Sequence, residues 1–213
     1  MALTGFDPSE VNSSINSVKS AYENLIAALG DDMQNQFVSG MADKWACNDA
    51  QKFFNNGLKP AVESLIKSSN TIFESVVNAM NSGGKAWAAQ TQSSYSGQTF
   101  SMINKSLDTS VIQENISGIR GIDLASATTV ANKLTTIAES ANSALTKAQQ
   151  AVQNCGFIGG SQASNLIASL GTIKSKLDNA TRELTSQAKS AIDKTVERYS
   201  DTEGKISQAF SAQ

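Results

Sequence analysis

The sequence predicts an all-α protein: an elongated four-helix bundle of two antiparallel helical hairpins, with pseudo-twofold symmetry and a long, partly helical connector. Two observations support this fold class. Apolar residues recur at steps of three or four along four long stretches, which is the spacing of one helix face. The 213 residues include only two prolines and 14 glycines, whereas a β-rich chain needs a turn every 8–12 residues or so.

The pattern divides the chain into three parts. Residues 1–82 are expected to form a first helical hairpin, residues 83–122 a connector, and residues 123–213 a second hairpin with a C-terminal tail. Because each hairpin consists of two periodic stretches and a short turn, we interpret the pair as a degenerate internal duplication. A single hairpin leaves much of its apolar face in water, so the two hairpins are expected to pack together.

The first helix begins with a capping pattern. Asp7 is placed to cap the helix, Pro8 occupies its first position, and Glu10 completes a capping box. Gly30 and the two aspartates that follow it predict a local weakening of an otherwise continuous helix. The apolar positions of its buried face are Val11, Ile15, Val18, Tyr22, Leu25, Leu29, Met33, Phe37 and Met41.

The turn after this helix covers residues 44–49 and is too short for anything except an antiparallel connection. Either Asn48 or Asp49 can cap the helix that follows. Gly57 and Pro60 predict a kink in that helix, because Pro60 has no N–H to donate to residue 56. Residues 7–82 are therefore predicted to form one long hairpin.

The second hairpin repeats these signals. Asp123 is expected to cap its first helix, and Ser161 is expected to cap its last helix after a glycine-rich turn. The connector is long enough to join antiparallel hairpins, since an extended chain covers ~3.3 Å per residue. A structureless loop of this length is uncommon in a compact domain, so we expect residues 85–92 and 108–118 to be partly helical.

The composition excludes most catalytic and metal chemistry. The chain has no histidine, which removes Ser-His-Asp and Cys-His catalysis and His-ligated zinc. Cys47 and Cys155 are expected to be free thiols without an activating neighbour. We therefore expect no enzymatic activity, no catalytic residue, no cofactor and no metal site.

Charge and hydropathy exclude two further partners. The net charge is −2 and there is no basic block, so no binding of nucleic acid is expected. The longest apolar run is Leu25 to Leu29, whereas a membrane-spanning helix needs ~20 residues, so no transmembrane segment is expected. The N-terminus also lacks the basic and apolar regions of a cleavable signal peptide.

The two predicted turns carry related motifs. The first is Trp45-Ala46-Cys47, and the second is Phe157-Ile158-Gly159. Helical hairpins with Trp-x-Gly at the turn are typical of the WXG-motif (ESAT-like) substrates of type VII secretion, and this chain resembles a tandem, fused form of that family. Cys47 stands at the glycine position of the first motif, and Phe157 stands at the tryptophan position of the second.

The C-terminal tail adds a second point of resemblance. Tyr199 and Glu203 fit the Tyr-x-x-x-Asp/Glu export signal of this family, and a spacing of four places both on one helix face. The resemblance implies an effector or export partner, recognised by a type VII-type export ATPase through Tyr199, Glu203 and the Trp45 turn together. It also implies a bacterial protein that is secreted or held at the cell surface without a cleavable signal peptide, with another secreted helical protein or a second copy as a further partner.

Other interpretations stay open at this point. Trp45 and Phe157 are equally consistent with hydrophobic plugs at the ends of a bundle, and Tyr199 with the last core residue of its helix. Helices rich in Ser, Ala, Asn and Gln are also typical of a flagellin-like structural subunit of a filament or appendage. A helical membrane-acting toxin is the third hypothesis, although the chain contains no long apolar segment.

Overall fold

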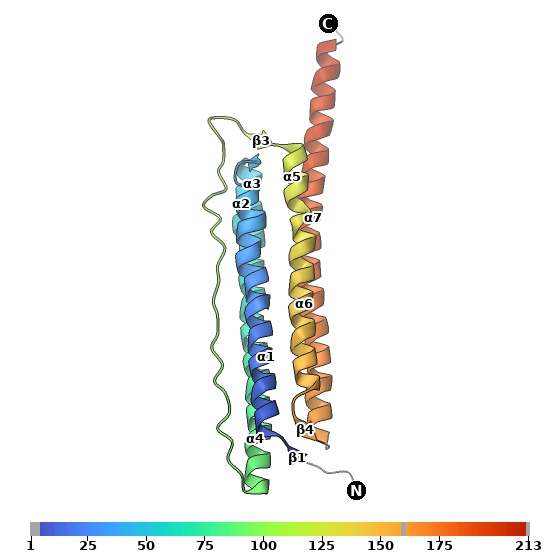
Figure 1. The fold of residues 1–213 in the computed structure, drawn as a ribbon. Helices are drawn as coiled ribbons and strands as arrows, with labels where there is room; N and C mark the ends of the chain where they lie inside the picture. The colour runs from blue at the N-terminus through green and yellow to red at the C-terminus, as the bar shows by residue number, and fades with distance from the viewer. Residues whose placement is uncertain (1–4, 159–160, 212–213) are drawn as a thin grey trace. The chain divides into compact units, whose positions relative to one another are not determined.

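The computed structural model describes residues 5–158 and 161–211, and it confirms the all-α helical bundle (Figure 1). By its contacts the chain forms two compact units, and each unit takes segments from both hairpins. Unit 1 comprises Met1–Ala27, Leu65–Lys105 and Ser140–Ala180, and unit 2 comprises Ala28–Ser64, Ser106–Glu139 and Thr181–Gln213.

The first arm of the first hairpin is one continuous helical run, as predicted. The strand β1 (Gly5–Phe6) leads into α1 (Pro8–Ile26), the π-helical η1 (Ala27–Val38) and the short α2 (Ser39–Met41). Asp7 caps α1, because its Oδ1 accepts hydrogen bonds from the N–H groups of Ser9 and Glu10 at 2.8 and 3.2 Å. The wider π turns contain Gly30, where a weakening of the helix was expected.

The second arm begins with the strand β2 (Trp45–Ala46) and continues through α3 (Asn48–Lys52), the π-helical η2 (Phe53–Leu58) and α4 (Lys59–Thr91). The predicted cap was wrong. Cys47 caps α3 with its Sγ 3.4 Å from the N–H of Ala50, and Asn48 is already the first helical residue. The change in helix type falls directly before Pro60, whose missing N–H removes one α-helical hydrogen bond.

The second hairpin begins with the strand β3 (Gly121–Ile122) and the helices α5 (Leu124–Ala131) and α6 (Lys133–Gln153). The strand β4 (Phe157–Ile158) and the long helix α7 (Ser161–Ser211) follow. Asp123 caps α5 as predicted, with its Oδ1 3.0 Å from the N–H of Ser126. Ser161 is the first residue of α7 rather than a residue that precedes the helix.

Unit 1 contains the start of the first hairpin and the turn of the second. The strands β1 and β4 pair antiparallel, and the N–H of Asp7 donates to the carbonyl of Gly156 at 2.9 Å. The turn of one hairpin therefore lies beside the beginning of the other, as antiparallel hairpins require. Buried apolar residues of this unit include Val11, Ile15, Val18, Tyr22, Leu25, Phe73, Val77, Met80, Leu145 and Val152.

Unit 2 repeats this arrangement with the two hairpins exchanged. The strands β2 and β3 pair antiparallel, and the N–H of Asp123 donates to the carbonyl of Lys44 at 2.7 Å. The antiparallel prediction is thus confirmed in each unit separately. Buried apolar residues of this unit include Leu29, Met33, Phe37, Met41, Phe54, Leu58, Val62, Leu134, Ile137 and Ile192.

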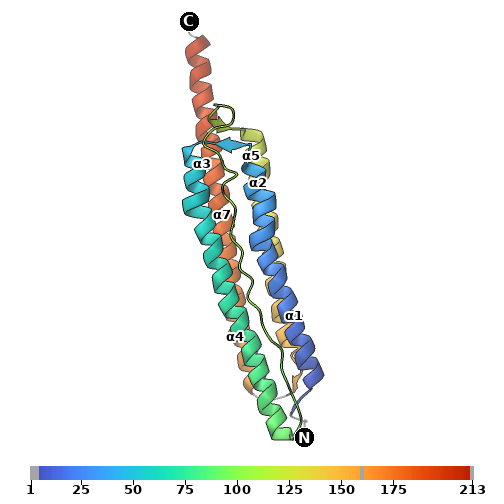
Figure 2. The same ribbon diagram turned by 90° about the vertical axis from the view of Figure 1, so that its left-hand side faces the viewer.

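The connector differs from its prediction in one half. Residues 85–91 are helical because α4 continues to Thr91, as expected. Residues 108–118 are not helical: they form an extended segment with turns, part of the green coil between α4 and β3 in Figures 1 and 2. The physical reason is that side chains of the first hairpin, such as Gln34 at Asp108, bind the connector backbone and replace the hydrogen bonds of a helix.

Candidate functional site

The first turn lies in unit 2 and is held by its own aromatic cluster. Trp45 is only 2% exposed, and its ring lies 5.6 Å from Phe53 and 6.1 Å from Phe54 between centroids. Its indole nitrogen is buried and has no hydrogen-bond acceptor among the described residues. The turn motif therefore presents a covered tryptophan, which packs as a hydrophobic plug.

Cys47 links this turn to the last helix. Its Sγ caps α3, and its side chain lies close enough to the Tyr199 phenol of α7 to influence that group's pKa. Burial raises the pKa of the Tyr199 phenol, and the neighbouring Cys47 side chain raises it further. The structure thus brings Tyr199 and the first turn together.

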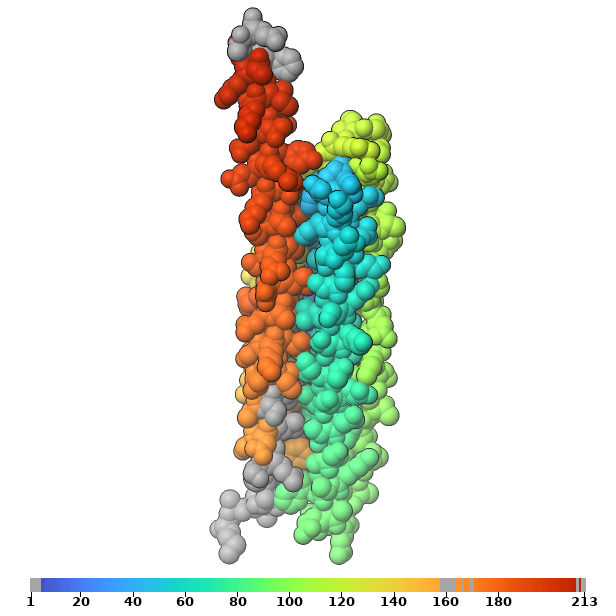
Figure 3. Space-filling model, turned by 180° about the vertical axis from the view of Figure 1, so that it is seen from behind, coloured from blue at the N-terminus to red at the C-terminus, as the bar shows by residue number. Residues whose placement is uncertain are grey.

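The tail beyond Tyr199 has a different environment. Arg198 and Asp49 of α3 form an ion pair with a closest separation of 3.6 Å, and both side chains are exposed. Every residue from 200 to 209 is exposed, including Glu203. This end of α7 is red in Figure 3. The half-buried Tyr199 therefore faces Cys47, while Glu203 faces solvent one turn further along the helix.

The second turn lies in unit 1. The ring of Phe157 packs against Gly83 of α4, where an added Cβ would come within 2.9 Å of the ring. Gly83 is thus needed as a small residue in the middle of a helix. Gly159, the glycine of the predicted motif, lies outside the described residues.

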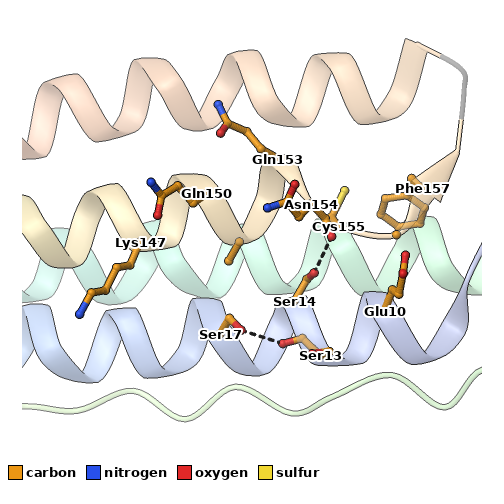
Figure 4. A pocket seen from close by; sticks show the side chains of 12 residues that line it. Glu10, Ser13, Ser14, Ser17, Lys147, Gln150, Gln153, Asn154, Cys155 and Phe157 are labelled. Atoms are coloured by element: carbon orange, nitrogen blue, oxygen red, sulfur yellow. Dashed lines mark hydrogen bonds between the residues drawn. The ribbon is translucent and has the colours of Figure 1, made fainter.

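A polar cleft of about 670 Å³ opens beside the second turn, between α1 and α6 (Figure 4). Ser14 donates a hydrogen bond to the carbonyl of Asn154 at 2.9 Å, and Lys147 and Glu10 lie toward opposite ends of the cleft. Cys155 is buried at its edge, and this burial raises the pKa of the thiol, so that it stays protonated at neutral pH. The cleft offers no nucleophile paired with a base.

The described residues include no group of three or more acidic or cysteine side chains that is arranged to hold a metal ion. Within the same residues, no helix combines the length and the apolar character needed to cross a membrane.

The chain is similar to a known protein family over part of its length. Residues 98–155 match the bacterial flagellin C-terminal helical region. This stretch contains part of the connector, α5 and α6, and it covers less than half of the chain. No curated protein and no solved structure matches the chain.

Each unit also contains one copy of a short repeat that was not predicted from the sequence. Gly5-Phe6-Asp7 and Gly121-Ile122-Asp123 each form a short strand followed by the cap of a helix. Each strand pairs with the turn of the other hairpin. The shared pattern of glycine, an apolar residue and aspartate is the sequence signal from which both strand pairs were predictable.

Proposed function

We propose that this chain is a non-enzymatic helical subunit of an extracellular or surface filament, and that it works by association with other copies. The observation that carries the proposal is the similarity of residues 98–155 to the flagellin C-terminal helical region. The polar cleft agrees with a structural role, since it holds no pair of groups suited to catalysis.

The end of α7 supports the same proposal. Ile206 is 52% exposed on a stretch of helix whose residues 200–209 are all exposed. A single exposed aliphatic residue is common on protein surfaces, but an exposed helical end offers a second chain several turns on which to pack.

The proposal is tested by the assembly state of the full chain. We expect light scattering and electron microscopy to show elongated particles whose mass rises with protein concentration. Ile206→Ser is expected to weaken association, whereas the matched exposed control Gln208→Ser leaves it unchanged. A discrete monomer or dimer at all concentrations contradicts the proposal.

A second candidate function is favoured by the contact between Cys47 and Tyr199. Because it brings the tail to the Trp45 turn, it supports the hypothesis of a type VII secretion substrate that an export ATPase recognises through a composite surface. Glu203 is the solvent-facing part of that surface, and Tyr199 is the part that fixes the tail against the turn.

Export by a strain that carries a type VII system tests this candidate. Tyr199→Ala and Glu203→Ala are expected to abolish secretion, and Glu197→Ala, an exposed position two residues before Tyr199, serves as the control. Unchanged secretion of both variants, with helical circular dichroism intact, contradicts the export hypothesis and leaves the filament proposal standing.

A further inference from the structure

The extended part of the connector, residues 93–112, is bound through its backbone, and we call it the strap. In unit 1, Asn81 of α4 makes a two-fold contact with Gln98 of the strap. The Nδ2 of Asn81 donates to the carbonyl of Gln98 at 2.7 Å, and its Oδ1 accepts from the N–H of Gln98 at 2.8 Å. One side-chain amide thus satisfies both backbone groups of one strap residue.

A second contact of this kind holds Ile103, also in unit 1. Its N–H donates to the Oη of Tyr22 at 2.5 Å, and its carbonyl accepts from the Nδ2 of Asn70 at 3.1 Å. Tyr22 in turn donates to the Oδ1 of Asn70 at 2.6 Å. The N–H and the carbonyl of Ile103 therefore both have partners, which are side chains of α1 and α4.

Unit 2 contains a third contact of the same type. The N–H of Asp108 donates to the Oε1 of Gln34 at 2.8 Å, and the Nε2 of Gln34 donates to the carbonyl of Asp108 at 3.2 Å. The strap residues held in this way are therefore spaced regularly, at positions 98, 103 and 108.

The spacing in unit 1 has a geometric basis. Five extended residues span ~16.5 Å at ~3.3 Å each, and the eleven residues from Asn70 to Asn81 span ~16.5 Å of helix at ~1.5 Å each. A helix with an amide side chain every eleven residues therefore matches an extended chain held at every fifth residue. The first hairpin therefore binds this part of the chain as extended polypeptide, and we call the set of side chains that hold the strap the groove.

Strap side chains add to these backbone contacts; for example, Thr109 donates a hydrogen bond from its Oγ1 to the Oδ1 of Asn55. The three contacts use only backbone groups of the strap, while a few side chains provide apolar anchoring. The ring of Phe100 lies 4.8 Å from Tyr22 between centroids, and Leu107 and Ile112 are buried. A strap from a second copy presents the same groups in the same order, so the groove accepts either one.

The strap is joined to the first hairpin at a strained residue. Gln92 follows α4 directly and has a φ of 50°, a left-handed conformation that non-glycine residues adopt rarely. It is also the covalent link between the first hairpin and residues 93–213. Hinge segments under strain invite domain swapping, in which the hinge opens.

We propose that the first hairpin of one copy binds the strap and second hairpin, residues 93–213, of another copy, with Gln92 as the hinge. Each copy then offers one free groove and one free strap, so the exchange adds copies in an open-ended series. This inference rests on the proposed filament function and assigns the surfaces that join its subunits.

Disulfide trapping tests the exchange directly. A Cβ on Gly97 would lie 3.6 Å from the Cβ of Asn81, which is within the range of a disulfide. One copy carries Asn81→Cys, the other carries Gly97→Cys, and both carry Cys47→Ser and Cys155→Ser. After co-expression we expect a covalent heterodimer, which non-reducing electrophoresis and mass spectrometry detect.

Two controls make the trap specific. Asn78→Cys replaces Asn81→Cys at an exposed position of the same helix and should give no heterodimer. Gln98→Cys replaces Gly97→Cys, because Gly97 has a φ of 78° that strains a cysteine there. If neither strap variant gives a heterodimer with Asn81→Cys, the exchange does not occur and the inference is overturned.

Variants of the hinge provide an independent measurement. Gln92→Pro excludes a φ of 50° and is expected to raise the exchanged fraction several-fold, while Gln92→Gly removes the strain and lowers it. Equal association of the two variants in light scattering contradicts the hinge. Particles that form without any trapped heterodimer overturn the exchange alone, whereas monomers under all conditions overturn both the exchange and the filament function.

Discussion

The phenol of Tyr199 in α7 lies beside the side chain of Cys47, the residue that caps α3. This contact joins the last helix to the first turn within unit 2, although the two residues lie far apart in the sequence. The Sγ of Cys47 also accepts a hydrogen bond from the N–H of Ala50. The thiol at the glycine position of the Trp-x-Gly pattern therefore has a structural role of its own.

Removal of the Tyr199 hydroxyl should have a small, measurable effect. Tyr199→Phe keeps the ring and removes the hydroxyl beside Cys47, so we expect a loss of about 1 kcal/mol in the free energy of unfolding. Cys47→Ser retains both an acceptor for the helix cap and a partner for Tyr199, and it should be nearly neutral. Urea denaturation measures both changes, and a larger loss for Cys47→Ser contradicts the assignment.

Replacing Trp45 with phenylalanine should reduce the free energy of unfolding by less than the burial of Trp45 suggests. Trp45→Ala removes a large buried ring and should cost about 3–5 kcal/mol. Trp45→Phe keeps an aromatic ring beside Phe53 and removes an indole N–H that has no acceptor among the described residues, so its cost should be clearly smaller. Equal losses for the two variants in thermal or urea unfolding would show that the N–H is needed.

The helices were predictable from the sequence because their signals are local. The Asp7 and Asp123 caps and the apolar positions at steps of three or four act within a few turns of the chain. The cap at Cys47 was missed because thiols are rare at this position, and an oxygen-bearing residue follows directly.

The strap was not predictable in the same way. Its conformation depends on Asn81, Asn70 and Gln34, which lie 17 to 74 residues away from their strap partners. No local sequence pattern indicates partners at such a distance along the chain. The apolar residues of 108–118 fit a helix as well as they fit an extended segment. The one available signal was the pair of asparagines eleven residues apart on the face of α4.

Two helical glycines should respond oppositely to alanine. A Cβ at Gly84 would lie 2.5 Å from the Cε1 of Tyr95, so Gly84→Ala must displace that ring and should cost about 1–3 kcal/mol. A Cβ at Gly57 would meet nothing within 4 Å, so Gly57→Ala should stabilise the chain by about 0.5–1 kcal/mol. The melting temperatures of the two variants should move in opposite directions, and a stabilised Gly84→Ala variant would contradict the packing of Tyr95.

The backbone contact at Gln98 can be weakened by a single atom. Asn81→Asp keeps the acceptor for the N–H of Gln98 but replaces the donor with an oxygen that faces the Gln98 carbonyl. We expect a loss of about 1–3 kcal/mol and faster amide hydrogen exchange in residues 93–105. Asn78→Asp adds the same charge at an exposed position of α4 and should leave the rate of amide hydrogen exchange unchanged. Unaltered protection in both variants would show that Asn81 does not hold the strap.

Tyr22 should make the stability of the chain sensitive to alkali. Burial raises the pKa of its phenol above the ordinary value of 10.0, and the hydrogen bond from the Ile103 N–H opposes this only in part. Burial likewise raises the pKa values of Tyr95, Tyr199 and Cys155. When the pH rises above the ordinary pKa of such a group, the group holds its proton longer in the folded chain than in the unfolded chain. The stability of the fold is therefore full below about pH 9 and falls as the pH rises further.

The variant Tyr22→Phe separates the contribution of Tyr22 from those of the other groups. It should lower the free energy of unfolding at pH 8, because the N–H of Ile103 loses its acceptor. It should also make the decline between about pH 9 and 11 shallower, because one group with a raised pKa has been removed. Urea midpoints across this range measure both effects. An unchanged slope would mean that Tyr22 has the same pKa in the folded and unfolded chain. That result would contradict the burial of its phenol and its two hydrogen bonds.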